Sequence, residues 1–217
     1  MKTDSQVKKD VAAELKWNPA IDATKIGVEV TNGIVTLSGT VGTYAEKWAV
    51  EKVTQRVVGV KGLAVEIEVA VDNSGLRTDV DIARSAEQAL QWVTYLPNGT
   101  IKVMVEKGWL TLSGAVDWDY QRQTASGAVR YLAGVKGISD NIVINPTEVS
   151  KETKSGIEAA LARRSDSDDQ NISVEVSDGD VTLTGTVTNL WERELARETA
   201  WSAPGVRHVV DNLSIAY

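Results

Sequence analysis

The chain of 217 residues contains no cysteine and no phenylalanine, and its single histidine is His208. Without cysteine it has no disulfide, no thiol nucleophile and no thiolate metal site. One histidine is too few for the usual zinc or iron sites, and His208 stands at the start of a predicted strand, where we expect a surface residue. No residue set supports a reaction class, so we predict a protein that is not an enzyme and that has no metal or cofactor.

Long apolar segments are missing too. No run approaches the roughly 18–20 apolar residues of a membrane span, and the first residues lack the apolar core of a signal peptide. We therefore expect a cytoplasmic protein that is not transmembrane, or a periplasmic one if an export signal has been removed.

Basic residues are also in deficit. The net charge is −7, and residues 148–217 alone carry 7 basic and 13 acidic side chains. Nonspecific nucleic-acid binding depends on Lys and Arg that neutralise phosphates, so no nucleic-acid partner is expected. The same excess of acid disfavours simple adsorption to anionic lipid.

What the sequence does contain is a glycine frame that occurs three times. A Thr-Leu-Ser-Gly or Thr-Leu-Thr-Gly segment is followed, 20 residues after its glycine, by a Gly-Val pair. A Val-x-Val precedes the segment, and a further glycine lies between the Val-x-Val and the segment. The glycines of this frame are Gly33, Gly39, Gly59, Gly108, Gly114, Gly134, Gly179, Gly185 and Gly205. Such periodicity predicts one small unit used three times, at residues 7–71, 80–145 and 152–216.

Each unit is predicted to run helix, strand, strand, helix, strand. In the first, Ile26, Val28 and Val30 alternate with polar residues as a half-buried strand does. A second helix over residues 44–58 is long enough for a parallel return to the last strand. The fold class is therefore α+β, with three tandem αββαβ domains, each a three-stranded mixed sheet covered on one face by two helices. Because the connectors are short, we expect the repeats to pack on one another.

The glycines have predicted backbone roles. Asn32-Gly33 is a hairpin signal, because a type I′ turn needs positive φ at both positions. Gly39 has no side chain to pack on the inward face of its strand, so it either lets a helix approach closely or marks a bulge. Gly59 fits the left-handed residue just past a helix end. The same roles are expected in the other two repeats.

This pattern resembles the BON domain, named for bacterial osmotically inducible and nodulation proteins. The resemblance rests on the hairpin glycine, the Thr-Leu-Ser-Gly strand, the Gly-Val pair and a closing motif in the last strand that begins with Asn141 or Asn212. Repeat 1 departs from it, with Glu66 in place of the asparagine. The resemblance implies a bacterial protein that is not an enzyme, is tied to osmotic and envelope stress, and binds phospholipid or another envelope component.

Aromatic residues are the candidate binding residues. They gather near the start of the second helix and at the end of the first, and they are Tyr44, Trp48, Trp118, Tyr120, Trp191, Trp17 and Trp92. One interpretation is that these rings enter a membrane interface or a partner groove. The other is that they seal a sheet edge or the contacts between repeats.

Two functions remain open from the sequence. The first is a binding module for phospholipid or an envelope component, which the resemblance implies. The second is a soluble scaffold that binds a protein partner or forms a homo-oligomer through exposed aromatic rings and a polar sheet face.

Overall fold

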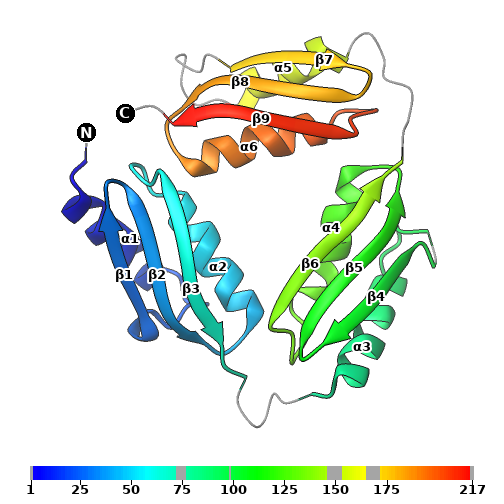
Figure 1. Cartoon of the computed structure of the whole chain (residues 1–217), viewed down its shortest axis with the longest axis horizontal. Coiled ribbons are helices and arrows are strands. Elements are labelled where there is room, and N and C mark those ends of the chain that lie inside the picture. The colour runs from blue at the N-terminus through cyan, green and yellow to red at the C-terminus, as the bar shows by residue number, and fades with distance from the viewer. Residues whose placement is uncertain (1, 72–76, 98, 146–152, 165–171, 216–217) are drawn as a thin grey trace.

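Helices and strands follow the same order in all three repeats of the computed structural model, which describes residues 2–71, 77–97, 99–145, 153–164 and 172–215 (Figure 1). Repeat 1 contains α1 (Asp4–Trp17), the short 3₁₀ helix η1 (Ala23–Lys25), β1 (Ile26–Thr31), β2 (Ile34–Val41), α2 (Tyr44–Gln55) and β3 (Gly62–Val69). Repeat 2 contains α3 (Asp79–Gln91), β4 (Ile101–Glu106), β5 (Trp109–Val116), α4 (Asp119–Val129) and β6 (Gly137–Ile144). Repeat 3 contains α5 (Thr153–Arg164), β7 (Ile172–Ser177), β8 (Asp180–Val187), α6 (Leu190–Trp201) and β9 (His208–Ile215). The αββαβ order is thus confirmed; the predicted ends of the third unit, residues 152 and 216, lie outside the described residues.

Each repeat builds its own three-stranded mixed sheet. In repeat 1, β1 and β2 are antiparallel, with Val30 opposite Val35, whereas β2 and β3 are parallel, with Leu37 opposite Val65. The strand orders β4-β5-β6 and β7-β8-β9 repeat this arrangement. A helix connects the two parallel strands in every repeat, as a parallel pair requires.

The hairpins close on two-residue turns with positive φ. Asn32 has φ 54° and Gly33 has φ 80°, and the same pair of conformations occurs at Lys107–Gly108 and Asp178–Gly179. A type I′ turn has this geometry, and its twist matches that of the flanking strands. The turns therefore have the conformation that the sequence predicts.

The first helix of repeats 1 and 2 is tied to the hairpin turn by an aspartate. The Asp4 carboxylate accepts hydrogen bonds from the backbone N–H groups of Asn32 and Gly33, at 2.8 and 2.9 Å. Asp79 does the same at the turn of repeat 2, at 2.7 and 2.9 Å. Both aspartates stand at the first position of a helix, where a negative charge also complements the helix dipole.

The strand glycines allow a neighbouring backbone segment to approach closely. Gly39 has φ 128° and Gly114 has φ 135°. A Cβ on Gly39 would collide with the carbonyl oxygen of Lys25, and one on Gly114 with that of Thr100. The chain entering the first strand of each hairpin passes there, and in repeat 1 the residue in contact, Lys25, is the last residue of the 3₁₀ helix η1. Of the two expected roles, close approach is therefore the one observed, and Gly39 stays in regular register with Ile26, without a bulge.

The second helix of repeat 1 is shorter than predicted. It ends at Gln55, and residues expected to continue it to position 58 form a turn in which the Val60 N–H donates to the Val57 carbonyl. Gly59, with φ 100°, lies in this turn instead of directly after the helix. Gly134 and Gly205 have φ 88° and 81° in the matching turns. Their left-handed conformation serves the turn into the last strand.

Each repeat has a separate hydrophobic core between its sheet and its two helices. Core residues that are almost inaccessible to solvent include Val11, Leu37 and Val50 in repeat 1, Ile82, Leu112 and Ala125 in repeat 2, and Ile157, Leu183 and Ala200 in repeat 3. These cores cover only one side of each second helix.

The three repeats are arranged as a closed ring, with α2, α4 and α6 facing its centre (Figure 1). The start of each of these helices lies beside the end of the next one, so the contacts run head to tail around the ring (Figure 1). The side of α6 that faces away from its own sheet is consequently covered by the other repeats. None of the residues from Leu190 to Trp201 is fully exposed. The repeats pack on one another as expected.

Candidate functional site

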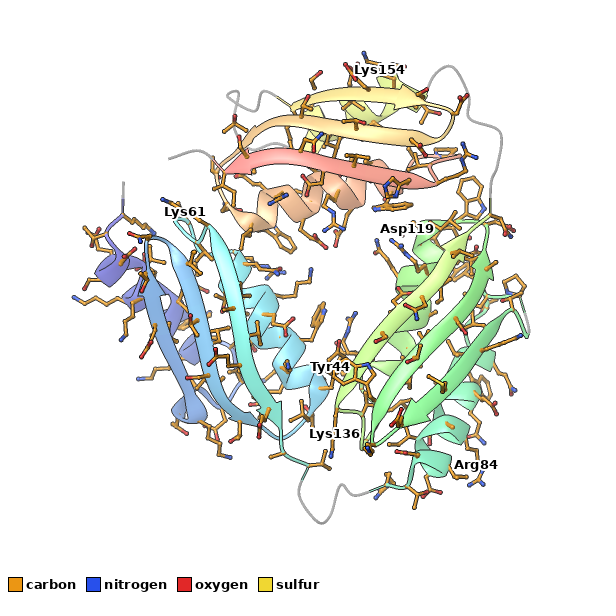
Figure 2. The ribbon with its side chains drawn as sticks, viewed as in Figure 1. Tyr44, Lys61, Arg84, Asp119, Lys136 and Lys154 are labelled. Atoms are coloured by element: carbon orange, nitrogen blue, oxygen red, sulfur yellow. The ribbon has the colours of Figure 1, made fainter. Side chains whose placement is uncertain are left out.

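The first residues of two central helices, α2 and α6, reach into a neighbouring repeat. Tyr44 of α2 packs against the core of repeat 2, and Leu190 of α6 packs against the core of repeat 1. The matching residue of α4, Asp119, is buried with only 3% exposed and is ion-paired with Arg122 at 2.5 Å. Figure 2 labels Tyr44 beside repeat 2 and Asp119 at the end of repeat 2 that faces repeat 3. This position thus joins repeats through apolar contacts at two junctions, whereas at the start of α4 it forms an ion pair within its own helix.

An arginine stacks on a tryptophan at every junction of the ring. Arg130 of repeat 2 lies 3.9 Å from the ring centre of Trp48 in repeat 1. Arg56 lies 4.4 Å from that of Trp191 in repeat 3, and Arg122 lies 4.6 Å from that of Trp201. Cation–π contacts of this kind contribute about 0.5–2 kcal/mol each, depending on desolvation. Lys52 and Glu194 add an ion pair at 3.7 Å between repeats 1 and 3.

Five of the seven predicted aromatic residues therefore divide into two groups. Tyr44, Trp48 and Trp191 lie in contacts between repeats. Trp17 and Trp92, at the ends of α1 and α3, are each 87% exposed.

The remaining two predicted rings lie at the start of α4. Trp118 is half-buried at the helix N-cap. Tyr120 is half exposed and makes an edge-to-face contact with the exposed ring of Tyr95, at 6.1 Å between centroids. Repeat 1 has Ala20 and Ala45 at the equivalent positions, and repeat 3 has Asp166 and Trp191, so the sequence has a ring at both positions only in repeat 2.

A pocket of about 600 Å³ lies between repeats 1 and 2, and we call it the junction pocket. Its apolar lining comes from the ends of β2 and β3, from the start of α2 and from the turn after α4, and it includes Val41, Ala45, Val71, Leu132 and Val135. Because two repeats form its walls, the pocket depends on their docking. It is large enough for part of a lipid or a similar small molecule.

The polar lining of the junction pocket is cationic. Lys25 and Arg130 line it, and no Asp or Glu is among its described lining residues. Lys25 is paired with Asp22 at 3.2 Å on the exposed rim. A hydrogen bond from Thr24, together with Lys25, holds the pKa of the Asp22 carboxyl below its ordinary value.

A second hollow of about 350 Å³ adjoins the first and shares Val71 and Gly134 with it. We call it the hairpin pocket, because the β4–β5 turn forms one wall. Arg77, Lys107 and Lys136 line it. Its one described carboxylate, Asp79, already accepts both turn N–H groups. The two pockets together gather five cationic side chains in a chain whose net charge is −7.

Burial perturbs two groups on α2 near the junction. Partial burial raises the pKa of Tyr44, and the negative charge of Glu51 adds to this effect. The Tyr44 hydroxyl also hydrogen-bonds to the backbone of Ile138 in repeat 2. Partial burial raises the pKa of Glu51 as well, against the effect of Lys47 and Lys52.

Several residues of this site were missed by sequence reasoning. The junction arginines Arg56, Arg122 and Arg130 and the cations of the hairpin pocket belong to no repeated motif. One signal was present: helix positions 55, 130 and 201 are equivalent, and they hold glutamine, arginine and tryptophan. A helix end that faces solvent has no need of a large side chain. The arginine and the tryptophan at this position therefore indicate contacts that differ from one junction between repeats to the next.

Other kinds of site are not found in the part of the chain that the structure describes. No group of three or more His, Cys, Asp or Glu residues there could hold a metal ion. His208 is exposed at the first position of β9.

Over the described ranges, every helix is too short or too polar to pass through a bilayer.

Comparison with known proteins places these features in a family context. The BON domain model matches residues 3–71, 78–146 and 150–217. Osmotically-inducible protein Y of Escherichia coli (strain K12) is 29% identical over 143 residues, which are 64% of this chain and 71% of that protein.

Among solved structures, CdsD, a structural protein of the type III secretion system of Chlamydia trachomatis, aligns over 96% of this chain and 91% of its own. The sequence identity is 14% and the TM-score 0.27. A second structure, of the CdsD C-terminal domain, aligns over the whole of both chains with 15% identity and a TM-score of 0.26. Likeness at this level carries no information about function.

Proposed function

The chain belongs to the BON domain family, and from this premise we propose that it is a binding protein without catalytic activity that holds anionic phospholipid between its first two repeats. It is related to osmotically-inducible protein Y. A role in osmotic or envelope stress is part of the proposal and is supported by that relationship.

The observation that carries the proposal is the pairing of an apolar pocket with a cationic one. The junction pocket has the volume and the apolar lining to take part of an acyl chain. The hairpin pocket beside it offers Arg77, Lys107 and Lys136 to a phosphate. An amphiphile with an anionic head would satisfy both pockets at once.

The uneven charge of the chain supports the same reading. The acidic excess is concentrated in residues 148–217, whereas the two pockets belong to repeats 1 and 2. Repulsion between the net charge and an anionic membrane is therefore weakest where the cations lie. The exposed rings of Trp17 and Trp92 have the amphipathic character of residues found at membrane–water interfaces.

Vesicle flotation tests the proposal. The double variant Lys107→Gln with Lys136→Gln should bind anionic vesicles roughly 30-fold more weakly than the unaltered protein, at about 1 kcal/mol for each lysine. A matched control, Lys8→Gln with Lys9→Gln, removes the same charge from exposed positions of α1 and should bind normally. Equal binding by both variants, or no binding by the unaltered protein at low salt, would refute the proposal.

Filling the apolar pocket gives a second, independent test. Ala45→Trp places a large ring at the wall of the junction pocket without changing charge. It should reduce the uptake of a fluorescent fatty acyl probe while leaving the binding of a soluble phosphate head group unchanged. Loss of both would indicate that the repeats no longer dock.

A protein-binding scaffold is the second candidate. The exposed pair Tyr95 and Tyr120, together with Trp92, favours it, because exposed aromatic rings of this kind are common at protein interfaces. A flotation failure combined with specific capture of a partner, abolished by Tyr120→Ser, would support this candidate instead. The cytoplasmic location stays a prediction that cell fractionation would test.

A further inference from the structure

Within the described residues, the first strand of each sheet is an open edge. The described part of β4 pairs with β5 alone, and β1 and β7 occupy the same place in their sheets. β4 lies on the outside of the ring, away from the other two repeats (Figure 1). An unpaired edge is a template for another strand unless charge or shape blocks it.

Two of the three edges carry a blocking charge at their centre. The outward side chains of β1 are Gly27, Glu29 and Thr31, and those of β7 are Ser173, Glu175 and Ser177. If either strand paired antiparallel with its own copy about its centre, two glutamates would lie directly opposite each other. Like charges in that position are destabilising.

The β4 edge differs at that same position. Its outward side chains are Lys102, Met104 and Glu106, and Met104 is 60% exposed. In an antiparallel pair of two β4 strands centred on Met104, the two methionines face each other. Lys102 of one copy then faces Glu106 of the other, twice, so opposite charges pair on both sides of the centre.

The backbone supports this register. The two-residue turn closes on Glu106 and Trp109, which are opposite each other in the hairpin. Hydrogen-bonded and non-hydrogen-bonded pairs alternate along an antiparallel ladder. With Glu106 in a hydrogen-bonded pair, the backbone groups of Val103 and Val105 point to the free edge, where they can bond to Val105 and Val103 of the second copy.

We propose that two copies of this chain associate through their β4 edges into a continuous six-stranded sheet. The contact is two-fold symmetric and therefore closes on itself. Met104, which is exposed on the face of the sheet that carries Lys102 and Glu106, would extend the contact beyond the backbone. A single strand pair buries little area, so the dimer is weak and depends on concentration. It does not rest on lipid binding.

Sedimentation equilibrium over a wide concentration range tests the dimer, with circular dichroism to verify the fold. Met104→Glu recreates the blocked edges of repeats 1 and 3 and should raise the dissociation constant about tenfold or more. Lys102→Glu and Glu106→Lys should each weaken association, and the double exchange should restore it, because only the double variant again pairs opposite charges. The control, Thr31→Glu, adds the same charge to an exposed position of β1, an edge that Glu29 already blocks, and should leave the dissociation constant unchanged.

Two outcomes would overturn the proposal. The first is a protein that stays monomeric at all concentrations. The second is a dimer that Met104→Glu leaves intact or that the double exchange fails to restore. Neither outcome bears on vesicle flotation, which reports on the pockets alone.

Discussion

Replacing Tyr44 by alanine tests whether the ring acts as one folding unit. Tyr44 belongs to repeat 1 in the sequence, but its half-buried ring packs against the core of repeat 2 and its hydroxyl bonds to the backbone of Ile138. A fully buried aromatic residue costs about 3–5 kcal/mol when cut back to alanine, so a half-buried one should cost about 2 kcal/mol.

The hydrogen bond adds to this value. Its loss should cost about 1 kcal/mol, and Tyr44→Phe removes this part alone. Tyr44→Ala should therefore lower the free energy of unfolding by about 3 kcal/mol in total. In a cooperative unit of this size, each kcal/mol lowers Tm by about 2–4 °C, which gives roughly 6–12 °C for alanine and 2–4 °C for phenylalanine.

Calorimetry and hydrogen exchange together give the assay. Calorimetry should show one transition that moves with each variant. Hydrogen exchange of the alanine variant should become faster in β6 of repeat 2, although the substitution lies in repeat 1. A rise in exchange confined to residues 4–69, or a separate repeat 2 transition at an unchanged temperature, would refute the reasoning.

The remaining predictions concern single positions. Gly114→Ala should lower the free energy of unfolding by about 2 kcal/mol or more, because φ is 135° and the new Cβ meets the Thr100 carbonyl. Gly127→Ala, in open space within α4, should raise it by about 1 kcal/mol; urea titration measures both. Burial raises the pKa of Glu51, so the folded state favours its protonated form and loses stability as pH rises through the folded pKa. Glu51→Gln should thus raise Tm at about pH 7 but not at about pH 3, and an equal gain at both would contradict the burial argument. Asp79→Ala should cost about 1–2 kcal/mol and speed amide exchange at the β4–β5 turn, because two charge-assisted hydrogen bonds are lost.

The architecture of one repeat follows from local chemistry. Asn32-Gly33 can adopt positive φ at both positions, and the alternation of Val28 and Val30 indicates which strand face is buried. These signals act over a few residues and occur in all three repeats. A misleading signal in one repeat is therefore outweighed by the same positions in the other two. The end of α2 was less predictable, because a turn at residues 56–60 and a further helical turn have similar apolar spacing.

The aromatic residues show where such reasoning stops. Trp17 and Trp48 look alike in the sequence, since each stands on a helix near a boundary. Trp17 is 87% exposed, whereas Trp48 is covered by Arg130 from another repeat. Helix periodicity identifies the side that faces the repeat's own sheet, but it contains no information about what covers the other side.

The sequence by itself therefore determined the repeat, its count, its hairpins and the absence of thiol chemistry, since each depends on residue type and short spacing. Only the tertiary structure decided that the repeats close into a ring, that Arg–Trp pairs join them, and that cations from distant segments meet beside an apolar pocket. Those contacts join residues far apart in the chain, at positions where the three repeats differ. Their formation depends on the relative orientation of whole domains, which local propensity does not encode.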